Sequence, residues 1–206
     1  MSHFQPEFSY DKRIVMAKLL LLTLISGLFL TQPVSAQLIA REKLAPVNRL
    51  KDFNGKTFMV KPAGKPVAYI FLSTECPLCK NYAPVLQAMQ QKHPEIQFYG
   101  IISGITFLRS EVAAFTRDYG ITFPLLMDPA KHIANSLDAT VTPEVILMGK
   151  NGKEYYRGLI DDWVVALGKT RKVATKKYLE QAINSVETGG EPLPATTPVG
   201  CLISNF

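Results

Sequence analysis

The sequence predicts an α/β fold in which a central mixed sheet carries helices on both faces. Two observations predict it. First, short apolar runs that are typical of strands alternate along the chain with segments of helical spacing, which favours a mainly parallel sheet. Second, the apolar run 69–72 leads into a Cys76-Pro77-Leu78-Cys79 motif, after which a helical pattern begins. The length of 206 residues and the hydrophobic content of 47% fit one globular domain with flanking segments.

Residues 1–36 have the features of a secretory signal peptide. A basic region precedes an apolar stretch at 19–30, and the segment ends in the small residues Ser35 and Ala36. The apolar stretch is shorter than the roughly 20 residues that a membrane-spanning helix needs. Translation could begin at Met16, and an uncleaved signal would act as an inner-membrane anchor. In either case we expect the folded part to be exported to the periplasm.

The folded domain is expected at residues 37–188. An N-terminal hairpin is predicted at 50–60, because Asn54-Gly55 lies between two apolar segments, which is a strong hairpin signal. After the helix of the cysteine motif, residues 96–102 predict a strand.

The middle of the domain is expected to hold two further helices. Ser110 suits the N-cap of a helix at 111–119, and Gly120 suits its end. Residues 123–128 predict a short strand, and residues 130–137 predict a short helix. This alternation is the basis for expecting helices on both faces of the sheet.

The last part of the chain predicts a hairpin, a helix and a tail. A strand is expected at 141–148, where Pro143 marks its start because proline cannot donate to a strand ladder. Residues 154–160 predict its antiparallel partner, and a long final helix is expected at 170–186. The proline-rich residues 189–206 predict an extended C-terminal tail.

The net charge of +6 is compatible with any class of globular protein, and it indicates which partners the chain could attract. The excess of lysine and arginine gathers at 169–177, which we interpret as one solvated helix face. Because no aromatic residues are interleaved with these charges, we do not expect nucleic acid as a partner. Weak attraction to an acidic partner or a lipid surface, and so peripheral membrane association, is compatible with this segment.

The Cys76-x-x-Cys79 spacing predicts dithiol redox chemistry. A thiol at a helix N-terminus lies near unpaired N–H groups and the positive end of the helix dipole, which favour the thiolate. We therefore expect Cys76 to be the nucleophile, with a pKa below the ordinary value of about 8.5, and Cys79 to be the resolving thiol. A zinc site is the alternative, but zinc takes about four ligands, and the chain has three Cys and three His in all. We expect no cofactor and no metal.

Around this motif the chain resembles the thioredoxin superfamily. Cys79-Lys80 followed by Pro84 and Leu86 is similar to the C-K-x-x-x-P-x-L pattern of that family. The resemblance implies a thioredoxin-like fold in which Pro84 bends the active-site helix, as proline does by removing a hydrogen bond.

The resemblance also implies the substrate-binding residues. It makes Thr142-Pro143 a cis pair that faces the cysteine motif, with Thr142 offering its backbone to a substrate disulfide. Pro77 completes the expected substrate-binding set. The sequence departs from the thioredoxin pattern at Glu75, which replaces the usual tryptophan, and at Ile70, which replaces a buried acid.

The N-terminal hairpin and the long spacing from Cys76 to Pro143 are similar to exported thioredoxin-like proteins of the TlpA/ResA kind. The closing Gly200-Cys201-x-Ile203 resembles a redoxin subgroup of the AhpC/TSA proteins. The resemblance implies an exported thiol–disulfide oxidoreductase, with protein dithiols or disulfides and a redox partner as its partners. We expect it to act as a monomer.

Two other functions stay open. A peroxiredoxin-type peroxidase would use Ser73 as its hydroxyl residue and Arg157 as its arginine, although position 69 is Tyr where that family has Pro. A Sco-like copper protein would use thiolates, which suit Cu(I), with His93 or His132 as a further ligand.

Cys201 is an odd thiol in a chain expected to be exported, and such thiols tend to oxidise or pair. One interpretation is a small buried residue, anchored to the domain by Leu202 and Ile203. The other is a third thiol, carried by the tail to the active site, where it forms a disulfide with Cys76.

Overall fold

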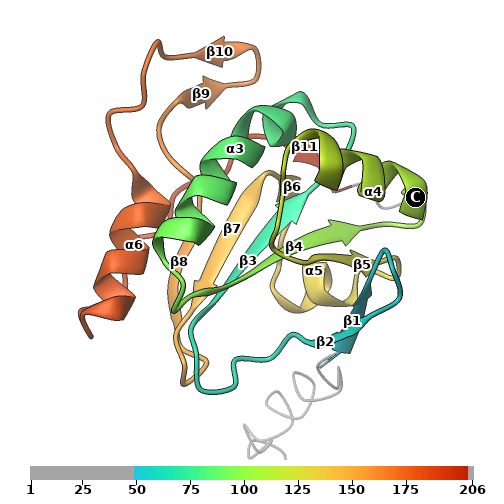
Figure 1. Cartoon of the computed structure of the whole chain (residues 1–206). Helices are drawn as coiled ribbons and strands as arrows, with labels where there is room; N and C mark the ends of the chain where they lie inside the picture. Colours follow the sequence, from blue (N-terminus) through green and yellow to red (C-terminus); the bar gives the residue numbers. More distant parts are fainter. Residues whose placement is uncertain (1–48, 204–206) are drawn as a thin grey trace, which may run out of the picture. The chain divides into compact units, whose positions relative to one another are not determined.

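A computed structural model describes residues 49–203, and the predicted signal peptide and residues 37–48 lie outside that range. The core of the structure is a seven-stranded sheet with the strand order β2-β1-β5-β4-β3-β7-β8 (Figure 1). The strands are β1 (Arg49–Asp52), β2 (Thr57–Met59), β3 (Val67–Leu72), β4 (Gln97–Ser103), β5 (Leu125–Asp128), β7 (Glu144–Met148) and β8 (Glu154–Gly158).

The sheet is mixed, as the sequence predicts, but the expectation of a mainly parallel sheet is wrong, because four of its six strand pairs are antiparallel. Strand β4 pairs in parallel with β3 and β5, whereas β3–β7, β7–β8, β1–β5 and β1–β2 are antiparallel pairs. The predicted N-terminal hairpin is the β1–β2 pair, which joins the sheet through β5.

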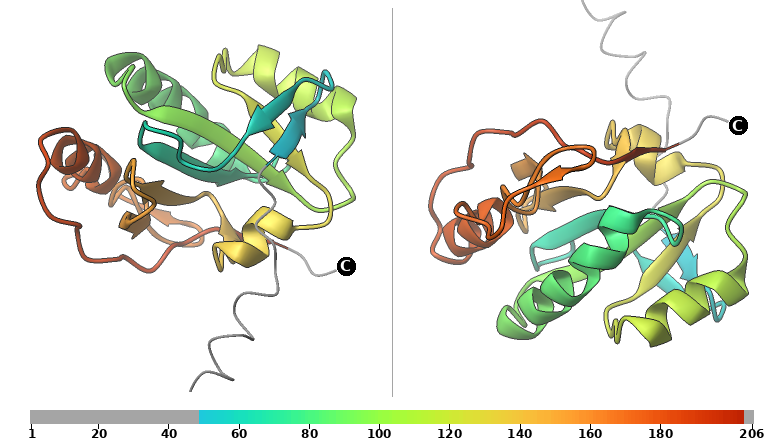
Figure 2. Two further views of the ribbon diagram at one scale, coloured as in Figure 1. Left: turned by 90° about the horizontal axis from the view of Figure 1, so that it is seen from below. Right: turned by 90° about the horizontal axis from the view of Figure 1, so that it is seen from above.

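Helices cover both faces of the sheet (Figure 2). Alternate residues of β3 contribute to two separate hydrophobic clusters, which is why all six of its residues are buried. One cluster includes side chains of α3 (Pro77–Lys92), α4 (Arg109–Asp118) and α6 (Tyr178–Glu187), and the other includes side chains of α5 (His132–Ser136).

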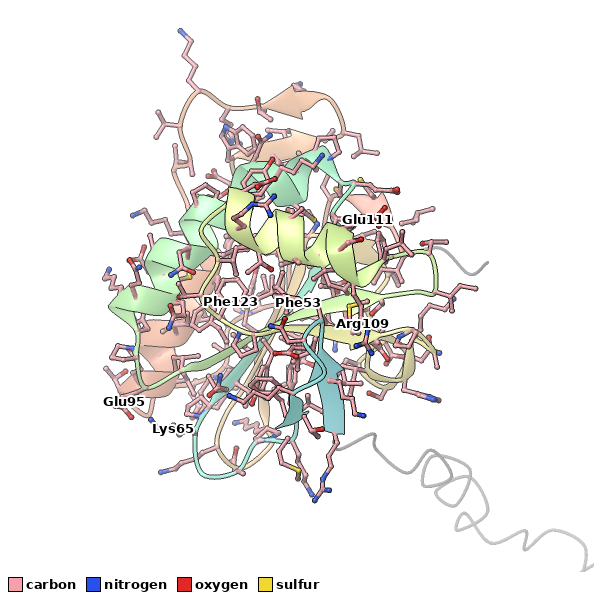
Figure 3. The ribbon with its side chains drawn as sticks, turned by 45° about the vertical axis from the view of Figure 1, so that its right-hand side comes forward. Phe53, Lys65, Glu95, Arg109, Glu111 and Phe123 are labelled. Atoms are coloured by element: carbon pink, nitrogen blue, oxygen red, sulfur yellow. The ribbon has the colours of Figure 1, made fainter. Side chains whose placement is uncertain are left out.

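The start of α4 differs from the expectation. The N-cap is Leu108, and Ser110 lies inside the first turn. The carboxylate of Glu111 accepts a hydrogen bond from the Leu108 N–H at 3.0 Å, which satisfies the N-terminal end of the helix without a hydroxyl cap. Figure 3 shows Arg109 and Glu111 at this end. Gly120 follows the C-terminal end with φ of 62°, as a helix stop requires.

Helix α5 is shorter than the predicted 130–137. Its start is fixed by Asp128 at the end of β5, whose Oδ2 accepts hydrogen bonds from the N–H groups of Ile133 and Ala134, both at 3.1 Å. The helix therefore begins close to the end of the strand, and its buried side chains cover the second cluster.

The prediction of one helix over 170–186 is wrong in its first half, because α6 begins at Tyr178. Before it the chain forms a loop with the small hairpin β9 (Val164–Ala166) and β10 (Lys169–Thr170), drawn above α3 in Figure 1. The carboxylate of Asp162 accepts hydrogen bonds from the Thr175 N–H and hydroxyl, both at 2.6 Å, and from the Lys176 N–H at 2.9 Å. These bonds hold 175–176 out of the helix, so the basic residues lie on an exposed loop.

The tail runs along the outer edge of β8. The Leu193 N–H donates to Tyr155 O at 2.8 Å, and the Thr196 N–H donates to Arg157 O at 3.0 Å. A Cβ at Gly158 would lie 2.2 Å from Thr196 O, so this close approach needs glycine. The tail is extended, as predicted, and it ends in β11 (Cys201–Leu202) paired with β6 (Val141–Thr142).

None of the helices between residues 49 and 203 has the length and apolar character to cross a membrane.

The loop that precedes α6 gives a first testable prediction. Hydrogen bonds, above all from the Thr175 hydroxyl, lower the pKa of Asp162 to about 2, so the charged carboxylate and its contacts are present at neutral pH. The substitution Asp162→Asn weakens these contacts. We expect amide hydrogen exchange over 163–176 to become about tenfold faster or more, while α6 keeps its protection.

The matched control is Asp118→Asn, which removes an exposed carboxylate that pairs with Arg117 at 2.9 Å. It should leave exchange in the loop unchanged. Equal exchange in Asp162→Asn and the wild type would show that Asp162 does not hold the loop.

Candidate active site

Cys76 lies at the junction of β3 and α3. Its backbone is extended, with φ of −72° and ψ of 118°, and it forms the N-cap of the helix, which starts with Pro77 at a position that proline favours. Cys79 lies one turn further on. Both thiols are buried, with 2% of Cys76 and none of Cys79 exposed. The sequence places this pair correctly at a helix start.

The junction of β6 and β7 lies against Cys76. The Cys76 thiol contacts the carbonyl oxygen of Thr142 at 3.2 Å, although 66 residues separate them. The Thr142-Pro143 peptide bond is cis, as the resemblance implies. Among the predicted substrate-binding residues, Thr142 is therefore beside the thiol, and Pro77 is exposed next to it on the helix.

Cys201 completes a group of three thiols. Its Sγ lies 2.6 Å from the Cys76 Sγ. Strand β11 pairs antiparallel with β6, so that Cys201 is opposite Thr142 and Leu202 is opposite Val141. A Cβ at Gly200 would lie 2.1 Å from the Thr142 carbonyl oxygen, so only glycine permits the tail to approach this closely.

The first interpretation of Cys201 expected both Leu202 and Ile203 to anchor the tail, and the structure differs from it. Ile203 packs against the second hydrophobic cluster and donates its N–H to Thr140 O at 2.9 Å, but 80% of Leu202 is exposed. Backbone pairing and one side chain therefore hold β11 in place. The second interpretation, which brings Cys201 to Cys76, agrees with the observed positions.

The three thiols differ in acidity. Hydrogen bonds from Cys79 and, to a lesser extent, from Cys201 lower the pKa of Cys76 to about 4. The helix N-terminus acts in the same direction. Burial raises the pKa of Cys79 well above its ordinary value, although Cys79 Sγ also accepts the Ser73 N–H at 3.4 Å. Burial and the neighbouring Cys76 raise the pKa of Cys201 to about 11. The arrangement thus favours one thiolate, at Cys76.

A pocket of about 280 Å³ lies beside this group. Cys76, Thr142, Cys201 and Ser103 line it, and the loop before α4 contributes Thr106 and Phe107. Glu75 also lines it but is exposed, as expected for a carboxylate beside a thiolate. Ile70, which stands where the thioredoxin pattern has a buried acid, is fully buried within β3.

Of the residues named for the two alternative functions, Ser73 lines the pocket beside Cys76, and its hydroxyl accepts the Glu75 N–H at 3.2 Å. The others make contacts away from this pocket. Arg157 forms two hydrogen bonds to Glu154, at 2.9 and 2.7 Å, and Tyr69 donates its hydroxyl to Val60 O. His93 pairs with Glu187 at 3.1 Å. His132 begins α5. Across residues 49–203, His, Cys, Asp and Glu side chains form no group of three that could hold a metal ion.

The sequence names Gly200 as part of the closing motif but does not predict its close approach to Thr142, and it does not predict the pocket wall at Thr106 and Phe107. The sequence does contain a sign of the close approach at Gly200, because a glycine directly before a cysteine in a proline-rich tail indicates that another backbone segment lies close to it. No local pattern marks the pocket wall, whose role depends on where the loop before α4 lies relative to α3.

Comparisons with known proteins place the chain in a family. The model of the AhpC/TSA family matches residues 42–157. The thiol-disulfide oxidoreductase ResA of Bacillus subtilis strain 168 is 31% identical over 112 residues, which are 53% of this chain and 62% of that protein. The match thus covers less than two thirds of that relative. ResA of Geobacillus thermodenitrificans strain NG80-2 is 27% identical over 154 residues, which are 69% of this chain and 85% of that protein.

A solved structure shows the fold. The thioredoxin-like protein from Aeropyrum pernix superposes with a TM-score of 0.52 at 17% identity, covering 75% of this chain and 94% of its own. The predicted thioredoxin-like α/β fold is confirmed.

The hydrogen bond from Cys79 gives a second prediction. Cys79→Ala removes the S–H donor, and we expect the pKa of Cys76 to rise from about 4 by one unit or more. Cys79→Ser keeps an O–H donor and should raise it less. The measurement is the ultraviolet absorbance of the thiolate as a function of pH in reduced protein.

The variant Cys76→Ser shows that the absorbance change at low pH comes from Cys76, since it should abolish this transition. If Cys79→Ala titrates like the wild type, the hydrogen bond from Cys79 is not what stabilises the Cys76 thiolate.

Proposed function

The chain belongs to the AhpC/TSA family, and from this premise we propose that it is an exported thiol–disulfide oxidoreductase with Cys76 and Cys79 as its dithiol. One observation carries the proposal. A thiol with a lowered pKa caps a helix beside the Thr142 carbonyl, and a buried thiol with a raised pKa lies one turn behind it. The names of the ResA relatives support the same activity.

The first step is attack by the Cys76 thiolate on one sulfur of a partner disulfide. The bond between the partner's sulfurs breaks, a Cys76–partner mixed disulfide forms, and the other partner sulfur leaves as a thiolate that takes up a proton. The lowered pKa of Cys76 keeps this nucleophile charged at neutral pH without a separate base.

The second step uses Cys79. In the reduced protein, part of the rise in its pKa comes from the charge and hydrogen bond of Cys76, and both disappear once Cys76 is in a mixed disulfide. Cys79 then loses its proton more readily and attacks Cys76 Sγ. A Cys76–Cys79 disulfide forms, and the partner leaves as a thiol. In the reverse direction the same steps oxidise a partner dithiol.

The partner is a protein dithiol or disulfide, with a second redox protein to restore the starting state. We expect Thr142, Pro143 and Pro77 to contact it, because the Thr142 carbonyl lies 3.2 Å from the Cys76 thiol, Pro143 follows Thr142, and the exposed Pro77 follows Cys76. Export to the periplasm rests on the signal features of residues 1–36, and the monomeric state rests on the sequence alone.

The roles of Cys76 and Cys79 can be separated with variants that keep one thiol each. Cys79→Ser/Cys201→Ser leaves only Cys76, and it should accumulate a mixed disulfide when mixed with oxidised glutathione. Cys76→Ser/Cys201→Ser leaves only the fully buried Cys79, and it should remain unmodified. Intact-mass spectrometry reads both results.

In a turnover assay with a protein disulfide, Cys76→Ser should lose activity by about 100-fold or more, since the nucleophile is gone. Modification of the Cys79-only protein, with none of the Cys76-only protein, would reverse the assignment.

A further inference from the structure

Strand β11 covers the sulfur that the proposed reaction needs to expose. Cys76 is 2% exposed with the tail in place, and Cys201 lies over it with an Sγ–Sγ distance of 2.6 Å. The backbone of β11 pairs with Val141 and Thr142, which border the same pocket. A partner that reaches Cys76 through this pocket therefore also encounters Cys201, which lines it as well.

Four features show that this position is built into the fold. Gly200 lacks the Cβ that would collide with the Thr142 carbonyl oxygen. The Ile203 N–H donates to Thr140 O at 2.9 Å, and the Thr142 hydroxyl contacts Cys201 O at 3.4 Å. Upstream, the Thr196 N–H donates to Arg157 O in β8, and the Thr196 hydroxyl accepts the N–H of Leu159, the residue after β8, at 2.8 Å.

Cys201 is also more accessible than Cys79. Cys79 is fully buried beneath Cys76, whereas Cys201 is only partly buried and lines the pocket. A disulfide between Cys76 and Cys79 is shielded from outside thiols on the Cys79 side. A disulfide between Cys76 and Cys201 presents a sulfur at the pocket surface.

We propose that Cys201 is a second resolving thiol of this site, which forms a disulfide with Cys76 and so connects the buried dithiol to the surface. The proposal rests on the function proposed above, since it requires Cys76 to be the nucleophile. It assigns to the C-terminal strand a catalytic thiol in addition to the Cys76–Cys79 pair.

The chemistry balances with the partner disulfide as the oxidant. After Cys76 has formed a mixed disulfide with the partner, Cys201 loses its proton and attacks Cys76 Sγ, and the partner sulfur leaves and takes up a proton. Exchange then follows within the protein. Cys79 loses its proton and attacks Cys76 Sγ, which gives the Cys76–Cys79 disulfide and returns Cys201 to a thiol.

The test removes Cys79 so that only Cys201 can resolve. When Cys79→Ser protein reacts with oxidised glutathione, we expect the glutathione adduct on Cys76 to be short-lived. Peptide mapping should recover a Cys76–Cys201 disulfide. In Cys79→Ser/Cys201→Ser the adduct should persist, with release at least about 100-fold slower, because no second thiol is held near Cys76.

Docking of the tail is tested separately with Cys201 left in place. Gly200→Val in the Cys79→Ser protein adds a Cβ that would lie 2.1 Å from Thr142 O, so β11 cannot pair and the adduct should again persist. The matched control is Leu202→Ala in the same background. Its side chain is 80% exposed, and the Cys76–Cys201 disulfide should form as before.

The outcomes distinguish this proposal from the proposed function. If the Cys79→Ser protein keeps its glutathione adduct on Cys76 while Cys201 is recovered as a free thiol, Cys76 remains the nucleophile but Cys201 has no catalytic role. If the variant that retains only Cys76 forms no adduct, the proposed function itself is wrong.

Discussion

The contact between the Cys76 thiol and the Thr142 carbonyl is the constraint on which the site depends. It joins the N-terminus of α3 to the junction of β6 and β7, two parts of the chain that are distant in sequence. β3 and β7 are hydrogen-bonded neighbours in the sheet, so their active-site ends lie together. Strand β3 is buried on both faces and packs against both hydrophobic clusters. This packing fixes the position of the active-site end of β3.

The sequence predicted the parts of the molecule whose structure is decided locally. The buried strand before Cys76, the helix after it and the Asn-Gly hairpin follow from apolar spacing and turn chemistry, and each is present. The helix expected at 170–177 failed because Asp162, several residues upstream, binds the backbone of Thr175 and Lys176. Helical spacing in a short window carries no information about such a distant acceptor.

The third thiol shows the same limit in the site itself. The composition of the tail predicted an extended segment long enough to reach the active site. It did not predict the position of Cys201. That position follows from the tertiary fit between Gly200 and the Thr142 carbonyl, and from the ladder between the tail and β8. With β11 in place, the reactive thiolate is stabilised by two neighbouring thiols and shielded from solvent. Access to Cys76 and its reactivity are therefore both linked to the tail.

In the proposed cycle, every redox step passes through Cys76. The most direct test is to equilibrate the wild-type protein with thiol–disulfide buffers across the range of about −120 to −270 mV in which such dithiols change state, and to map the disulfide at each point. We expect one two-electron transition after which one of the three cysteines is free, and a protein disulfide that always contains Cys76. Recovery of Cys76 as the free thiol in the oxidised protein would contradict it.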